Sequence, residues 1–135
     1  MPTIHNQDQV IGYGVAGAPL GSAGEPVLLF HGTTMNRSAW DFVIGSMPTE
    51  RSYIQVEFPG SGESAMPSGA LSVEGLVGDA LAVLDELKVD RFHVAGYSLG
   101  AVIAAATAAT APQRVVTATM LCGWATTDAR MRMTF

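Results

Sequence analysis

The chain has little of what would mark a protein for export or for nucleic-acid binding. Cys122 is the only cysteine among 135 residues, so no disulfide can form within the chain, and this fits a reducing compartment. Charged residues make up only 14% of the chain, and the formal net charge is −5 with no basic patch. Nucleic acid and anionic membrane surfaces are therefore poor candidates for partners.

Long apolar runs are missing as well. The N-terminus is polar and has neither the positive charge nor the apolar core of a signal peptide. The longest apolar stretch, near 101–111, is rich in alanine and too short to cross a bilayer. These absences predict a soluble, cytoplasmic protein without a membrane partner.

What the chain does have is a regular alternation of apolar segments and turn residues, in a composition that is 48% hydrophobic. Short β-rich or continuously apolar runs alternate with runs of helical spacing. Strands are expected at 10–15, 27–30, 52–58, 91–97 and 115–121, the last of them buried, and helices within 36–47, 72–87 and 99–111. The alternation predicts one α/β domain, a mostly parallel twisted sheet with helices on both faces. His5 is expected to lie in a mobile N-terminus.

The most informative stretch is Gly96-Tyr97-Ser98-Leu99-Gly100, which reads G-x-S-x-G. A strand-like run precedes the serine and an alanine-rich helical run follows it, which is the context that gives this motif meaning. Such a tight turn strains the backbone of the serine, and the glycines allow strand and helix to approach closely. The Ser98 hydroxyl then lies at the carboxyl end of a strand and at a helix N-terminus, as suits a nucleophile.

Two further segments follow predicted strands, where open α/β sheets place their ligand sites. They are His31-Gly32-Thr33 and the loop from Glu57 to Ser64. Together with G-Y-S-L-G, and with Trp40 following His31-Gly32, this ordered trio resembles the α/β-hydrolase family, in particular its esterase, lactonase, haloperoxidase-like and C–C hydrolase branch. The resemblance extends from Val10 to the final segment. Glu57 stands where the family usually has aspartate, and only a local effect is expected.

The resemblance implies a serine hydrolase that acts on small esters, lactones or related acyl compounds without metal or cofactor. Ser98 would be the nucleophile, and the backbone N–H groups of Thr33 and Leu99 would form the oxyanion hole. The candidates for the substrate pocket are His31, Gly32, Thr34, Tyr97 and Trp124.

The base and the acid that such a serine needs are not apparent in this chain. In the family both follow the nucleophile, whereas no histidine follows Ser98. His5 and His93 are interpreted as non-catalytic, and His31 resembles a structural loop histidine. The chain therefore resembles the N-terminal half of the fold, with 1–124 in the core and 125–135 at the start of a cap. A second polypeptide, the C-terminal half of the same hydrolase, is the expected partner, with the chain inactive alone.

Two other interpretations remain open at this stage. One is a degenerate half that lost its chemistry and serves as a binding or scaffold protein. The other is a cofactor-free haloperoxidase or perhydrolase that uses the same site. A homo-oligomer is also left open. Trp40 is expected to pack in the core, and Cys122 to be a small buried hydrophobe.

Overall fold

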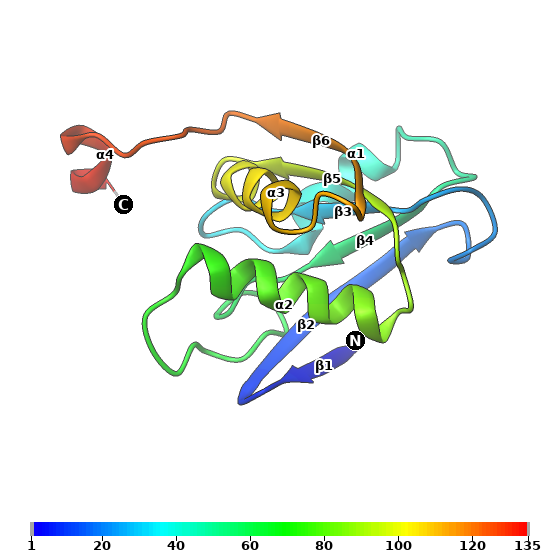
Figure 1. Cartoon of the computed structure of the whole chain (residues 1–135), viewed down its shortest axis with the longest axis horizontal. Coiled ribbons are helices and arrows are strands. Elements are labelled where there is room, and N and C mark those ends of the chain that lie inside the picture. The colour runs from blue at the N-terminus through cyan, green and yellow to red at the C-terminus, as the bar shows by residue number, and fades with distance from the viewer. Residues whose placement is uncertain (1, 135) are drawn as a thin grey trace.

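The computed structural model describes residues 2–134 and contains one six-stranded sheet in the order β1-β2-β4-β3-β5-β6 (Figure 1). None of the helices in that range is long and apolar enough to cross a membrane. The elements are β1 (Thr3–Asn6), β2 (Gln9–Gly17), β3 (Val27–Phe30), η1 (Arg37–Trp40), α1 (Asp41–Ile44), β4 (Ser52–Val56), α2 (Val73–Glu86), β5 (Phe92–Tyr97), α3 (Leu99–Thr110), β6 (Val115–Leu121) and α4 (Ala129–Thr134).

The sheet is mostly parallel, as the alternation of elements predicts. The pairs β3–β4, β3–β5 and β5–β6 are parallel, and β1–β2 and β2–β4 are antiparallel. The expectation that His5 lies in a mobile N-terminus is wrong, because β1 pairs with β2 through a tight turn in which Gln7 has φ 54°. His5 lies in this hairpin opposite Val10. The hairpin is held by backbone pairing, which a mostly polar segment such as 3–6 does not reveal through its pattern.

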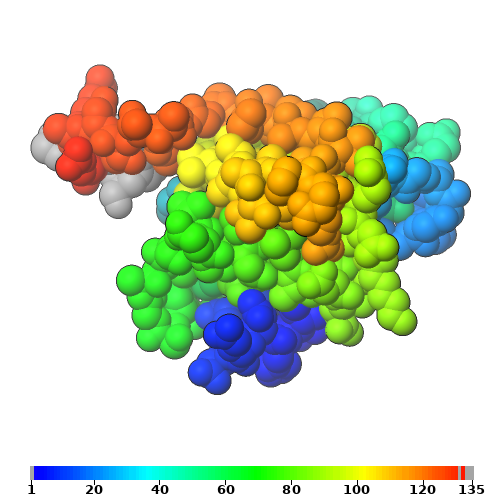
Figure 2. Space-filling view, viewed as in Figure 1, coloured from blue at the N-terminus to red at the C-terminus, as the bar shows by residue number. Residues whose placement is uncertain are grey.

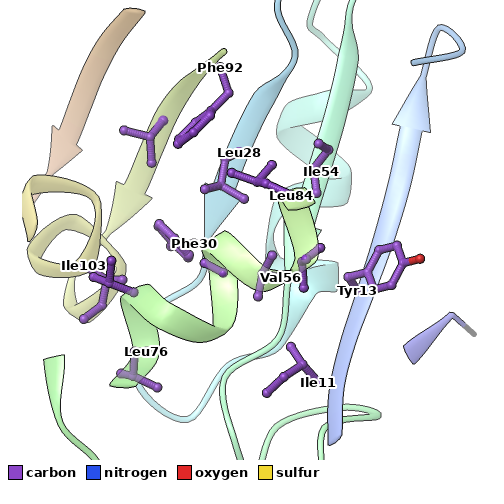
Figure 3. Close-up of a cluster of buried hydrophobic side chains, with 14 of the residues drawn as sticks. Ile11, Tyr13, Leu28, Phe30, Ile54, Val56, Leu76, Leu84, Phe92 and Ile103 are labelled. Carbon is purple, nitrogen blue, oxygen red and sulfur yellow. The ribbon is translucent and has the colours of Figure 1, made fainter. Parts of the chain in front are cut away.

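Helices cover the two faces unequally. Helices α2 and α3 pack on one face (Figure 1), where alternate residues of β3, Leu28 and Phe30, point into the larger apolar cluster (Figure 3). The other β3 residues, Val27 and Leu29, pack with Trp40 in a smaller cluster on the opposite face. Burial on both faces explains why β3 is continuously apolar. The expectation of helices on both faces is confirmed, although η1 and α1 are short.

Strand β6 has the predicted bounds but not the predicted burial. It is the last strand in the sheet order, and Met120 and Leu121 keep 52% and 45% of their surface exposed. Cys122 is exposed too, contrary to expectation. Beyond β6 the chain runs outward, so that α4 lies apart from the sheet (Figures 1 and 2). The predicted boundary between the core (1–124) and the start of the cap (125–135) stays a prediction. The first residue of the core and the last residue of the cap segment lie outside the described range.

The elbow between β5 and α3 requires two of its glycines. A Cβ on Gly96 would overlap the carbonyl oxygen of Gly100, and a Cβ on Gly100 would overlap the carbonyl oxygen of Phe30 in β3. These contacts involve backbone atoms, which cannot move aside like the end of a flexible side chain. The helix therefore approaches both strands at a distance that only glycine allows.

We predict that Gly96→Ala lowers the free energy of unfolding by about 3 kcal/mol, because the helix must move off the strand. Gly78→Ala is the matched control, since this glycine lies in α2 with no atom within 4 Å of an added Cβ. That change should raise stability by about 0.5–1 kcal/mol through the better helix propensity of alanine. Urea unfolding of both variants measures the contrast, and equal effects would contradict the close approach.

Candidate active site

Ser98 has the backbone geometry that the motif predicts. Its φ of 57° and ψ of −119° lie in a backbone region that residues other than glycine rarely adopt. The Ser98 N–H donates to the carbonyl oxygen of Leu121 in β6 at 2.9 Å, and the Ser98 carbonyl accepts from the N–H of Ala101 at 2.9 Å. Its side chain makes no capping hydrogen bond to α3. The hydroxyl is therefore presented at the sheet's carboxyl edge rather than used by the helix.

The loop after β3 lies directly against Ser98. A Cβ built on Gly32 would lie 3.4 Å from the Cβ of Ser98 and 3.2 Å from the Tyr97 ring. The next residue, Thr33, is exposed, and Thr34 has a positive φ of 62°. Within residues 2–134, no hydrogen bond engages the backbone N–H of Thr33 or that of Leu99. The two N–H groups that the sequence predicts as oxyanion-hole donors are thus not used by the fold.

His31 holds this loop and is not available as a base. It is 2% exposed, its Nδ1 lies 2.8 Å from the carbonyl oxygen of Gly32, and its Nε2 lies 3.2 Å from the backbone N of Phe58. A carbonyl only accepts and an N–H only donates, so Nδ1 carries the proton and Nε2 accepts. Burial lowers the pKa of His31, against smaller raising effects of Gly32 and Glu57. The ring stays neutral and joins the loop to the end of β4.

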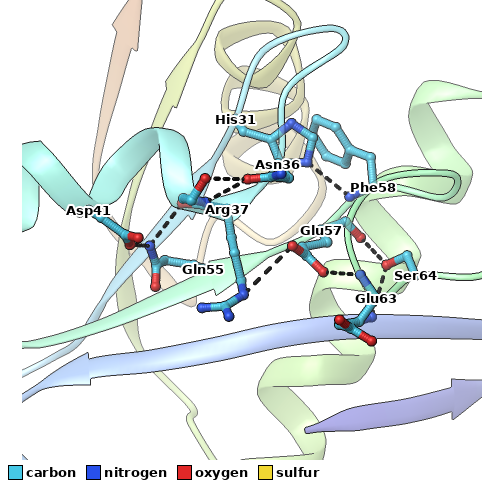
Figure 4. A network of polar contacts seen from close by, with 11 residues as sticks. His31, Asn36, Arg37, Asp41, Gln55, Glu57, Phe58, Glu63 and Ser64 are labelled. Carbon is cyan, nitrogen blue, oxygen red and sulfur yellow. Dashed lines mark hydrogen bonds and ion pairs between the residues drawn. The ribbon is translucent and has the colours of Figure 1, made fainter. Parts of the chain in front are cut away.

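A group of polar contacts around Glu57 and Gln55 fixes the start of η1. Arg37 Nε lies 3.6 Å from Glu57 Oε1, and the Glu57 side chain is only 3% exposed (Figure 4). The other oxygen of Glu57 accepts from the backbone N–H of Glu63 at 2.6 Å. Gln55 donates to the Arg37 carbonyl at 2.9 Å and to Asp41 Oδ1 at 3.0 Å. We call these contacts the polar clamp; it ties the β3–η1 loop to β4 and to the loop that follows.

An apolar cavity of about 300 Å³ opens next to Ser98. Ser98 itself does not line it, but Gly32, which lies against Ser98, and Tyr97, which precedes it, both do. Three of the predicted pocket residues, His31, Gly32 and Tyr97, line it. Trp124 lies instead in a separate hollow formed with α3 and the end of β6, and Thr34 lines neither. The structure thus brings three of the five predicted pocket residues together in one cavity.

The remaining histidines lie in other places. His5 is exposed in β1, four strands from β5 in the sheet order, and His93 Nδ1 is 2.8 Å from Thr117 Oγ1 on the sheet face that carries Trp40. Among residues 2–134, no three His, Cys, Asp or Glu side chains are grouped so that they could hold a metal ion.

Sequence analysis did not identify most of the cavity wall. The missed residues are Met35, Ala39, Trp40, Val43 and Leu121. Ala39, Trp40 and Val43 follow helical spacing, so one face of η1–α1 could have been proposed as a wall. Trp40 is buried as expected, and it packs in the core and lines the cavity at once.

Comparison with known proteins identifies the class that this fold and site define. The family model described as alpha/beta hydrolase fold matches residues 25–135. The chain is 32% identical, over its whole length, to the provisionally named carbamate hydrolase RutD of Azorhizobium caulinodans, of which it covers 49%. It is 35% identical over 76% of its length to the rhodomycin D methylesterase DnrP of Streptomyces peucetius, covering 36% of that protein.

Among solved structures, Est816, described as an N-acyl homoserine lactone degrading enzyme, is 31% identical with a TM-score of 0.80. That match covers 90% of this chain and 45% of Est816. The chain belongs to the α/β-hydrolase family. It spans about half the length, or less, of these relatives, and what it covers is their N-terminal fold as the sequence predicts.

We predict that His31 makes stability depend on pH. The unfolded chain takes up a proton near the ordinary pKa of 6.5, whereas the folded protein resists it because the pKa is lowered. The free energy of unfolding should therefore fall as pH drops below about 6.5, by up to about 1.4 kcal/mol per pH unit, until the folded pKa is reached.

Urea unfolding at a series of pH values measures this effect. His31→Gln removes the titrating ring, so the difference between wild type and variant isolates its contribution. The slope between pH 7 and pH 5 should be shallower in the variant, and identical slopes would refute the assignment.

Proposed function

We propose that the chain carries the nucleophile and the oxyanion hole of a serine hydrolase that acts on small esters, lactones or related acyl compounds. The observation that carries the proposal is the geometry of Ser98, a strained serine whose hydroxyl is not used to cap its helix and which lies against Gly32, the residue before Thr33. Strain of about 1–3 kcal/mol persists where the surrounding structure enforces it, typically at functional sites.

In the proposed reaction, Ser98 Oγ attacks the substrate carbonyl while a base takes its proton. The negative charge that forms on the carbonyl oxygen is stabilised by the N–H groups of Thr33 and Leu99, by about 3 kcal/mol for each donor. Collapse of the tetrahedral intermediate breaks the bond to the leaving alcohol, which takes the proton from the protonated base. Water then cleaves the acyl-serine by the same steps.

The base and its orienting carboxylate are proposed to come from a polypeptide that corresponds to the second half of the relatives. Both ring nitrogens of His31 are engaged, and His5 and His93 lie in other regions. The exposed edge of β6 is where such a polypeptide would extend the sheet, because an unpaired edge offers backbone donors and acceptors. This arrangement also covers Met120 and Leu121.

The names of the relatives favour acyl chemistry, since a methylesterase and a lactone-degrading enzyme are among them. A perhydrolase would use the same nucleophile, and a scaffold would use none. Reactivity of Ser98 therefore separates the enzyme from the scaffold, and the products separate the two enzymes.

We predict that the chain, assembled with the polypeptide that completes it, hydrolyses p-nitrophenyl butyrate and that Ser98→Ala lowers kcat/KM on the order of 10⁴-fold or more. A fluorophosphonate probe should label Ser98. The matched control is Ser68→Ala, a change at an exposed loop serine that should leave both readouts unchanged.

The outcomes discriminate between the interpretations. Hydrolysis that survives Ser98→Ala would rule out the nucleophile, and an assembly that neither hydrolyses nor labels would support the scaffold. Hydrolysis by the chain alone would show that the base is not supplied from outside it.

A further inference from the structure

The cavity beside Ser98 has a wall of one chemical kind. None of its eight lining residues carries a charged side chain. Five of them have large apolar or aromatic side chains: Met35, Trp40, Val43, Tyr97 and Leu121. His31 is neutral, with both ring nitrogens in hydrogen bonds, and Nε1 of Trp40 is buried out of reach of a ligand. An apolar group gains free energy in such a cavity, whereas a carboxylate would lose its hydration and find no cation.

The cavity lies on one particular side of the nucleophile. Six of its eight lining residues belong to 31–43, which follows β3, and the other two are Tyr97 and Leu121, the last residues of β5 and β6. The open edge of the sheet lies on the far side of β6. A base brought in at that edge must protonate the leaving group, so the leaving group lies on the β6 side. The group on the other side of the carbonyl then points toward the cavity.

We propose that this cavity binds the acyl group of the substrate and selects uncharged, apolar acyl chains of modest length. Val43 and Met35 are the residues that limit the length of the acyl chain. The proposal rests on the function proposed above and names its substrate class. A volume of about 300 Å³ is at the lower end of the usual range for ligand pockets, which favours short to medium acyl chains over long ones.

Val43 is a suitable position for a test because it is 40% exposed, so larger side chains can be placed there without disrupting the core. Its neighbour Phe42 is 89% exposed and does not line the cavity. Phe42→Ala is therefore the matched control, a change of size one residue away that leaves the wall intact.

We predict that the complete assembly prefers the p-nitrophenyl esters of butyrate and hexanoate to acetate, and discriminates against the succinate half-ester. Val43→Phe fills the cavity, so it should lower the hexanoate-to-acetate ratio of kcat/KM about tenfold, since each lost methylene contact changes discrimination by a factor on the order of ten or more. Val43→Lys should raise the ratio of succinate half-ester to butyrate. Phe42→Ala should change neither ratio.

A second series identifies the side of the ester that enters the cavity. With methyl, ethyl and butyl esters of butyrate, Val43→Phe should leave the ratios unchanged. A shift in this series, an unshifted acyl series or a wild-type preference for the half-ester would each overturn the proposal. Retained activity in Ser98→Ala would instead overturn the proposed function, so the two failures are distinguishable.

Discussion

The close approach of α3 to the sheet is the constraint on which the site depends. Because Gly96 and Gly100 let the helix backbone contact β5 and β3, the chain has no room to turn except through a left-handed residue, and that residue is Ser98. The burial of Ala101, Ile103 and Ala104 against the sheet holds the helix in place and offsets the strain. The serine is partly exposed at the edge, above this tight packing.

Polar contacts hold the loops in place, as apolar packing holds helix α3. A buried carboxylate such as Glu57 is tolerated only when its oxygens have partners, and here Arg37 and the N–H of Glu63 supply them. His31 adds a neutral contact between the β3–η1 loop and the end of β4. These contacts fix the loop that carries Thr33, so under the proposed function its N–H would be in position before any substrate arrives, which is the condition for stabilising a developing charge efficiently.

The sequence predicted those parts of the structure that local patterns encode. The continuous apolar run at Val27–Phe30 indicated a strand buried on both faces, and the motif around Ser98 indicated the elbow. The β1–β2 hairpin was missed because a polar strand paired through its backbone leaves no apolar signature. The local effect expected of Glu57 stays a prediction, but the pattern did not predict its ion pair with Arg37, twenty residues earlier. Contacts of this kind depend on how loops meet in space, which spacing along the chain does not encode.

The cavity wall and Ser98 come from separate short segments. Residues 31–43 form most of the wall, residues 96–100 form the elbow, and the two segments meet at Gly32. The polar clamp anchors the first segment through backbone atoms and through Arg37, leaving the side chains at 35 and 43 without a structural duty in the clamp. Under the proposed acyl-binding role, point mutations at these two positions would change the binding preference without moving Ser98, so the scaffold would adapt readily to new acyl groups.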